Sequence, residues 1–191
     1  MKKITKILPK RIYLQRGLTL AEIIVAIGSA ILIIGGAYSV YAVANKSFKA
    51  GSEKFDLTQN AKVPLEKIVR ELRETTEIIT QLPTDKNDPN LPPPTEITFL
   101  DANYSKYRYI TYYLTGSSVK RRVSHYYLPQ NPQDWLKYSD QLSSQIDEDE
   151  IIAQDISLLV FYGQNPIIID IRAQSGNDKF DLNTKIYQRN H

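Results

Sequence analysis

One carboxylate stands inside a long apolar stretch near the start of the chain. Between Leu18 and Ala44 the only charged residue is Glu22. Ionisable side chains are costly to place in membrane-length apolar segments, and where they occur they usually serve a specific contact. Glu22 is therefore the first candidate functional residue in this sequence.

Residue types that commonly build catalytic centres are sparse. The chain has no Cys, which excludes disulfides, thiolate metal sites and a cysteine nucleophile together. It also lacks G-x-S-x-G, a phosphate-binding glycine loop and H-E-x-x-H. The histidines are His125 and His191, and neither has a nucleophile or metal partner at a suitable spacing. We expect these histidines to have surface or packing roles, and we expect a protein that is not an enzyme and needs neither a cofactor nor a metal ion.

Two charged clusters lie in the second half of the chain. Asp147-Glu148-Asp149-Glu150 offers the oxygen ligands that Ca²⁺ prefers, but it lacks the spaced ligands and turn glycine of a calcium loop. A solvated acidic loop is the simpler interpretation. Lys120-Arg121-Arg122 falls in a predicted strand, and charge on an edge strand commonly guards against aggregation.

The element that carries Glu22 is long enough to cross a bilayer as a tilted helix. The first seventeen residues contain no acid and six basic residues, namely Lys2, Lys3, Lys6, Lys10, Arg11 and Arg16. Such a flank keeps the N-terminus in the cytoplasm and sends the following domain across the membrane. An ordinary secretory signal has a shorter apolar core with its cut site after it, so a plain or specialised anchor fits better.

A basic leader that ends in Arg16-Gly17 is followed by Leu18-Thr19-Leu20-Ala21-Glu22 and then by the apolar run. This order resembles the N-terminal motif of the type IV pilin family, which includes the pseudopilins of type II secretion. Leu18 replaces the Phe that is usual in the family. The resemblance implies cleavage by a prepilin peptidase between Gly17 and Leu18, and N-methylation of the new Leu18 amine. It also implies subunit assembly through Glu22, which would pair with that amine on a neighbouring subunit.

The same resemblance implies a structural role at a bacterial cytoplasmic (inner) membrane. The protein would be a single-pass subunit with its C-terminal domain outside the cytoplasm, and it would enter a filament after assembly. Its implied partners are the peptidase, other pilin or pseudopilin subunits, an inner-membrane assembly platform and membrane lipid. The larger J-type minor pseudopilins match best, because a Glu at the fifth mature position argues against the K-type.

Several alternatives remain open after this comparison of residues. A minor pilin of a type IV pilus or of a DNA-uptake machine fits the motif equally well. A membrane-anchored binding domain that never polymerises fits the apolar run, although it leaves Glu22 behind Gly17 without a reason. The chain also departs from the family, because it has no cysteine pair for a C-terminal disulfide and no proline near Ser39.

The net charge of +3 suggests a nucleic-acid binder at first sight. The six basic residues of the leader account for this sign. Without them, 18 of the 24 basic residues remain against 21 acidic ones, which gives a net charge of −3. The basic character thus belongs to targeting, and we expect no nucleic-acid partner.

The sequence predicts an α+β fold in three parts, which are the leader (1–17), a transmembrane and assembly helix (18–45) and an exported domain (46–191). Beyond the membrane, one helical face is formed by apolar residues three, four or seven apart. Pro64 is expected to bend or interrupt this helix, and Gly51 is a second weak point. The apolar face comprises Ala61, Leu65, Ile68, Leu72 and Ile79.

The rest of the exported domain is predicted to form short strands separated by turns, with the helix covering one face of an antiparallel sheet. Residues 81–96 form a loop rich in Pro, Asp and Asn, and residues 128–150 are predicted to be irregular. Two hairpins are expected, at Thr115–Ser118 and at Gly163–Asn165. The predicted strands are Ile97–Leu100, Tyr107–Leu114, Val119–Tyr127, Ile156–Tyr162, Pro166–Arg172 and Phe180–Tyr187. The thirteen tyrosines are expected to pack within this sheet rather than to form an adhesive face.

Overall fold

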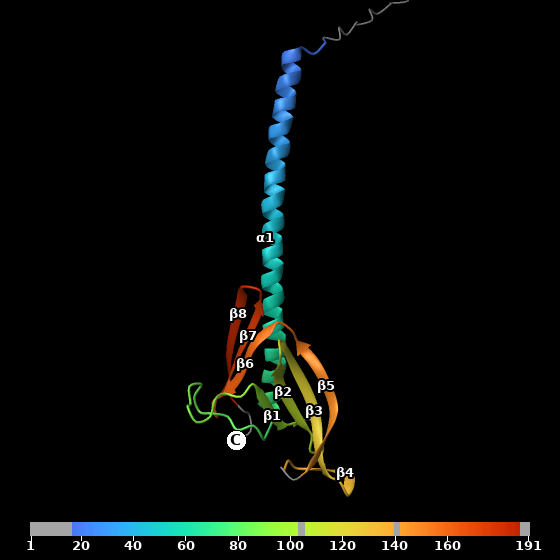
Figure 1. Cartoon of the computed structure of the whole chain (residues 1–191), viewed down its shortest axis with the longest axis vertical. Coiled ribbons are helices and arrows are strands. Elements are labelled where there is room, and N and C mark those ends of the chain that lie inside the picture. Colours follow the sequence, from blue (N-terminus) through green and yellow to red (C-terminus); the bar gives the residue numbers. More distant parts are fainter. Residues whose placement is uncertain (1–16, 103–105, 140–141, 188–191) are drawn as a thin grey trace, which may run out of the picture. The chain divides into compact units, whose positions relative to one another are not determined.

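The computed structural model describes residues 17–102, 106–139 and 142–187. The basic residues assigned to the leader, and His191, lie outside these described residues. The chain forms two compact units, Met1–Lys49 and Ala50–His191. Each unit is described by itself below (Figure 1).

The described part of the first unit is dominated by the beginning of helix α1, which runs from Leu20 to Glu74. Every residue from 17 to 49 is exposed. An eighteen-residue stretch of α1 has a mean hydropathy of 2.2, and none of that stretch is buried. By length and composition this helix can cross a membrane, as single-pass anchors and signal sequences do.

In the second unit the remainder of α1 is amphipathic, as the apolar spacing predicts. Ala61, Ile68 and Leu72 are completely buried on its inner face. Leu57 and Leu65 complete that face. The side chains point to one side because residues three and four apart share a helix face.

Two details of this helix refine the prediction. Pro64 lies buried inside α1, and the helix continues through it, so of the two expected effects an interruption is wrong and the bend stays a prediction. The helix ends at Glu74, so Ile79 lies beyond it, where its N–H donates to the Thr98 carbonyl over 2.8 Å. The end is explained by Thr75, whose hydroxyl is 2.7 Å from the Leu100 carbonyl, a bond that competes with continued helix.

Sheet A contains five antiparallel strands, and β3 is its centre. β3 pairs with β2, with the short β4 and with β5, while β1 pairs with β2. β2 and β3 form the first predicted hairpin, and its turn contains Gly116. The strands are β1 (Glu96–Leu100), β2 (Tyr109–Thr115), β3 (Ser118–Leu128), β4 (Asn131–Leu136) and β5 (Ser143–Ala153).

Sheet B is an antiparallel meander of β6 (Ile156–Tyr162), β7 (Ile167–Ser175) and β8 (Asp178–Ile186). The β6–β7 hairpin requires glycine at Gly163, where φ is +79° and an added Cβ would lie 2.3 Å from the Pro166 carbonyl oxygen. Along β7 every second residue from Ile167 to Ala173 is buried, the alternation expected of a strand with one face on the core.

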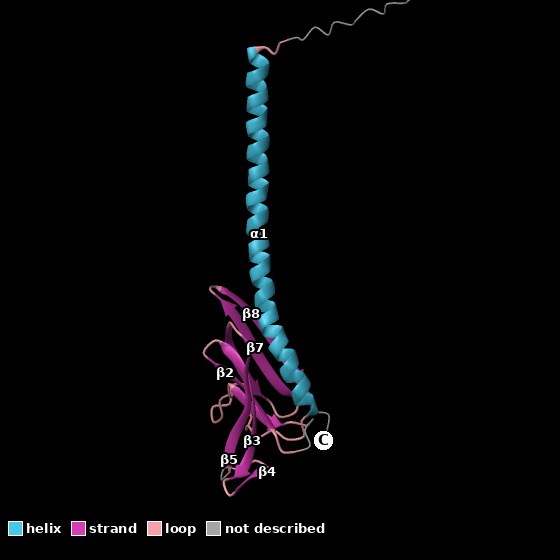
Figure 2. Cartoon of the chain, turned by 90° about the vertical axis from the view of Figure 1, so that its right-hand side faces the viewer, coloured by secondary structure: helices cyan, strands magenta, loops and turns pink. Residues whose placement is uncertain are grey.

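The core of the second unit lies between the apolar face of α1 and the inner faces of both sheets (Figure 2). Its largest fully buried side chains from the strands are Tyr112, Phe99 and Phe161. The expected α+β class, with a long helix packed on antiparallel strands, is therefore confirmed.

The interpretation of residues 128–150 as irregular was wrong, because this stretch contains β4 and most of β5. Residues 144–151 of β5 are exposed on both faces, so the strand lacks the alternation of apolar and polar residues by which strands are recognised. Its acids lie opposite the basic residues of β3, with Glu150 facing Arg121 and Asp149 facing Arg122. The acidic stretch is thus a strand and not a loop, and β3 is a central strand and not an edge.

Candidate functional site

The first turn of α1 is closed by a reciprocal pair of side-chain contacts between Thr19 and Glu22. The Thr19 backbone N–H donates to Glu22 Oε2 over 2.9 Å, and the Thr19 hydroxyl donates to the same oxygen over 3.0 Å. In return, the Glu22 backbone N–H lies 3.3 Å from the Thr19 hydroxyl oxygen. This arrangement is a capping box, with Thr19 as N-cap and Glu22 three residues later.

The capping box explains where the helix begins. Gly17, Leu18 and Thr19 lie outside α1, which starts at Leu20. Leu18 is 75 % exposed, and among the described residues no atom beyond the chain neighbours of Gly17 lies within 4 Å of the position a Cβ would occupy there. The peptide bond at which cleavage is predicted is thus outside the helix and accessible.

Glu22 consequently has a role inside its own helix that the analysis of the sequence did not assign. An acid in the first turn also interacts favourably with the positive end of the helix dipole. The Thr-x-x-Glu spacing at Thr19–Glu22 is the signal that predicts such a cap from sequence. The structure brings Thr19 and Glu22 together and places Leu18 directly before them.

A second group of polar residues joins α1 to sheet A. Glu71 Oε2 accepts a hydrogen bond from the Tyr112 hydroxyl over 2.7 Å and another from Arg121 Nε over 3.2 Å. Burial, and then the charge of Glu71, raise the pKa of Tyr112 far above its ordinary value. The phenol is therefore a permanent donor in the folded protein, which suits packing rather than proton transfer.

The acids of β5 each engage a partner on the neighbouring elements. Arg121 Nη1 contacts Glu148 over 3.2 Å, and Lys67 Nζ contacts Glu150 over 2.6 Å. Arg122 contacts Asp149 over 3.2 Å. Among the described residues no group of three or more His, Cys, Asp or Glu side chains is placed to hold a metal ion.

His125 is buried in sheet A and takes a packing role. Its ring stacks on that of Trp135, with centroids 4.2 Å apart and planes 8° from parallel. Its Nδ1 lies 2.9 Å from Asp147 Oδ2. The ring is thus held by β4 on one side and by β5 on the other, with no nucleophile among its described contacts.

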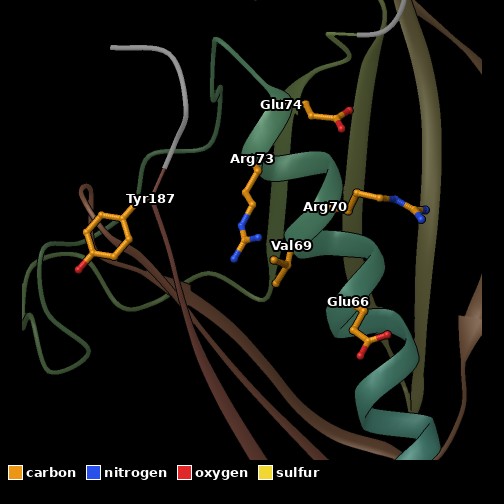
Figure 3. A pocket seen from close by; sticks show the side chains of 6 residues that line it. All are labelled: Glu66, Val69, Arg70, Arg73, Glu74 and Tyr187. Carbon is orange, nitrogen blue, oxygen red and sulfur yellow. The ribbon is translucent and has the colours of Figure 1, made fainter.

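A groove of about 600 Å³ follows the last turns of α1 (Figure 3). Val69 and Arg73 point toward the side on which Tyr187 lies, whereas Arg70 points to the opposite side of the helix. The two guanidinium groups therefore do not converge on one point, and the groove is not organised to hold a single anion. Its lining residues are Glu66, Val69, Arg70, Arg73, Glu74 and Tyr187.

Comparison of the chain with protein-family models, with curated proteins and with solved structures found no match. The architecture is therefore the remaining basis for a comparison with known proteins. The fold resembles that of the pilins, with a long N-terminal helix that is apolar at its start and packs farther along on antiparallel sheets. The same helix is a candidate N-terminal membrane anchor attached to a β-rich domain.

Proposed function

We propose that this protein is a minor pilin or pseudopilin, a structural subunit of a type IV pilus-like filament or of a type II secretion pseudopilus, and not an enzyme. One observation carries the proposal. An accessible Gly17–Leu18 bond lies directly before an exposed apolar segment, residues 18–44, whose only charged residue is Glu22 in the first turn of α1. A plain anchor needs the apolar helix but does not need the glycine before it.

The resemblance to the pilins implies the chemistry at these residues. A prepilin peptidase cleaves between Gly17 and Leu18, and the new Leu18 amine carries a positive charge that the precursor lacks there and is then methylated. The helix stays in the bacterial cytoplasmic membrane. Glu22 lies in the first turn of α1, near the membrane edge, where burial costs less than at the bilayer centre.

Assembly then pairs Glu22 of one subunit with the Leu18 amine of the next. Two opposite charges in a medium of low dielectric constant offset their desolvation only if their geometry is good. Such a pair selects one register between neighbouring helices more than it adds stability. Other subunits of the filament and an inner-membrane assembly platform are the partners that this role requires.

Within this class we place the protein near the tip of the filament. The 174 residues that would remain of the 191 after removal of the 17-residue leader are many for a major subunit, and Glu22 distinguishes the chain from the K-type. Both features favour the larger J-type minor pseudopilins of type II secretion. Genes for secretion components beside this one would support that machine, and genes for a retraction ATPase would support a pilus.

A second function is favoured by the capping box itself. Because Thr19 and Glu22 satisfy each other, Glu22 has a local reason to be present without any neighbouring subunit. A single-pass protein that displays a binding domain outside the cytoplasm and never polymerises would use this cap equally well. Glu22→Gln separates the two functions.

Glutamine also serves in a capping box, so Glu22→Gln keeps the helix start and removes the charge. Cleavage and insertion should continue, because the leader and Gly17 are unchanged. Loss of one partner of a buried ion pair costs about 3–5 kcal/mol, so the full-length variant should co-purify with its partner subunits at least about a hundredfold less than the unmodified protein.

Ser39→Ala is the matched control for this experiment. It removes a polar group from the same helix without a change of charge. Among the described residues the Ser39 hydroxyl bonds to the Gly35 carbonyl of its own helix. This variant should assemble normally. If Glu22→Gln also assembles normally, the charge has no role between subunits and the anchored domain becomes the better assignment.

A further inference from the structure

Glu22 uses one of its carboxylate oxygens within its own chain. Both bonds from Thr19, one from the backbone N–H and one from the hydroxyl, end on Oε2. Within the part of the chain that the structure describes, no bond to Oε1 is found. A carboxylate accepts about four hydrogen bonds in total, so Oε1 retains its full capacity for a cation.

We infer that Thr19 is a positioning residue for Glu22, and that it orients Oε1 toward the amine of a neighbouring subunit. This inference rests on the proposed function, since it assumes that the amine is created at Leu18. A free glutamate side chain samples many rotamers, and ordering it on assembly would weaken the contact. The two Thr19 bonds remove most of that freedom before the neighbour arrives.

The same cap also positions the other member of the pair. Leu18, which would carry the amine after cleavage, is bonded directly to Thr19, whose N–H is tied to Glu22. The amine is therefore kept close to the first turn of its helix, with rotation about the Leu18 Cα–C bond as the freedom that remains. An ion pair between two such ends joins two groups that are both ordered in advance, which is the condition under which buried pairs are favourable.

The hydroxyl of Thr19 can be removed with little change of shape. Thr19→Val keeps the branched side chain and the backbone N–H but loses the hydroxyl bonds, whereas Thr19→Ser keeps the hydroxyl. Loss of an N-cap hydroxyl corresponds to about a fivefold change in an equilibrium, so Thr19→Val should reduce co-purification with partner subunits by about that factor. Thr19→Ser should restore it, and cleavage should be unchanged in both variants.

A double variant distinguishes positioning from general weakening of the helix. If Thr19 acts through the charge of Glu22, Thr19→Val should cause no further loss in a Glu22→Gln background. If Thr19 merely stabilises the helix, it should cause the same fivefold loss in both backgrounds, and the inference is wrong. Normal assembly of Thr19→Val would overturn it as well.

Thr19→Ala is a second hydroxyl-free variant, for use if Thr19→Val is not inserted. All arms use the full-length chain expressed with its partner subunits. Intact mass reports cleavage separately from assembly. Failure of the proposed function is distinguishable, because then Glu22→Gln alone would leave assembly intact.

Discussion

Glu71, Tyr112 and Arg121 connect one helix to two strands through a single carboxylate oxygen. Tyr112 and Arg121 both donate to Glu71 Oε2, and the side chains of Arg121 and Glu71 are only 11 % and 15 % exposed. A buried charged acceptor that loses a donor keeps its desolvation cost without compensation. The network therefore fixes the position of α1 on sheet A more strictly than apolar packing alone.

Tyr112→Phe tests this contact with little loss of apolar area. The substitution leaves Glu71 with Arg121 as its remaining described donor in the network, so the free energy of unfolding should fall by about 1–3 kcal/mol. Tyr187→Phe is the control, because Tyr187 is 65 % exposed and its change should stay within about 0.5 kcal/mol. Urea denaturation of both variants would measure this, and equal losses would contradict the role of the Tyr112 hydroxyl.

The Lys67–Glu150 pair predicts a dependence of stability on pH. The hydrogen bond from Lys67 is the largest influence on Glu150 and lowers its pKa below the ordinary 4.5. A carboxyl whose pKa is lower in the folded than in the unfolded state contributes stability above its unfolded pKa. That contribution is lost as the pH falls through the folded pKa.

Lys67→Met should therefore destabilise the protein at neutral pH and reduce its further loss of Tm on acidification below about pH 5. Melting curves at a series of pH values would show a flatter acid limb for this variant. Lys62→Met is the control, because Lys62 lies 3.7 Å from Glu66 in an exposed helical pair. The same acid limb in wild type and Lys67→Met would show that the contact has no such linkage.

At the scale of elements, the second half of α1 and the strands of sheet B could be predicted because their apolar residues repeat with the period of the element. The hairpin turns at Gly116 and Gly163 could be predicted as well. β5 could not be predicted, because its acids are stabilised by β3 and α1 rather than by an apolar face. Information of that kind lies in the pairing of distant segments and not in the strand itself.

The candidate functional residues also divide into those that the sequence predicts and those that it does not. Gly17, Leu18 and Glu22 follow from a local motif, and the cap could have been predicted from the four residues Thr19–Glu22 of that motif, although it was missed. The link from Glu71 to Tyr112 and Arg121 spans 41 and 50 residues. No local pattern contains it, since it requires the register of β2 on β3.

The burial of the inner face of α1 predicts which substitutions in this helix lower the free energy of unfolding. Ile68 is fully buried, whereas Val63 on the same helix is 54 % exposed. Ile68→Ala should lower the free energy of unfolding by about 2–5 kcal/mol through lost contacts and the cavity left behind. Val63→Ala should change it by less than about 0.5 kcal/mol. Similar losses from both substitutions would mean that the helix does not pack by this face.

At the scale of the molecule, the chain combines a unit with every described side chain exposed and a unit with its own core. All members of the core cluster belong to residues 50–191, so this part contains what a folded domain requires. The exposed apolar residues of the first unit need another environment, which a bilayer or neighbouring apolar helices would supply.

Residues 50–191 expressed alone should therefore be soluble and fold cooperatively. Circular dichroism should show mixed helix and strand, and size-exclusion chromatography should show a single species. Persistent aggregation, or a spectrum of nearly pure helix, would contradict the division into units.

The central claim is that the chain is a processed subunit, and the N-terminus of the mature protein tests it most directly. The full-length protein should be extracted from membranes of bacterial cells that contain a prepilin peptidase, and its intact mass measured together with its N-terminal peptide. The account predicts loss of residues 1–17 and a first residue, Leu18, that carries one methyl group on its amine. A chain that retains the entire leader in such cells would contradict it.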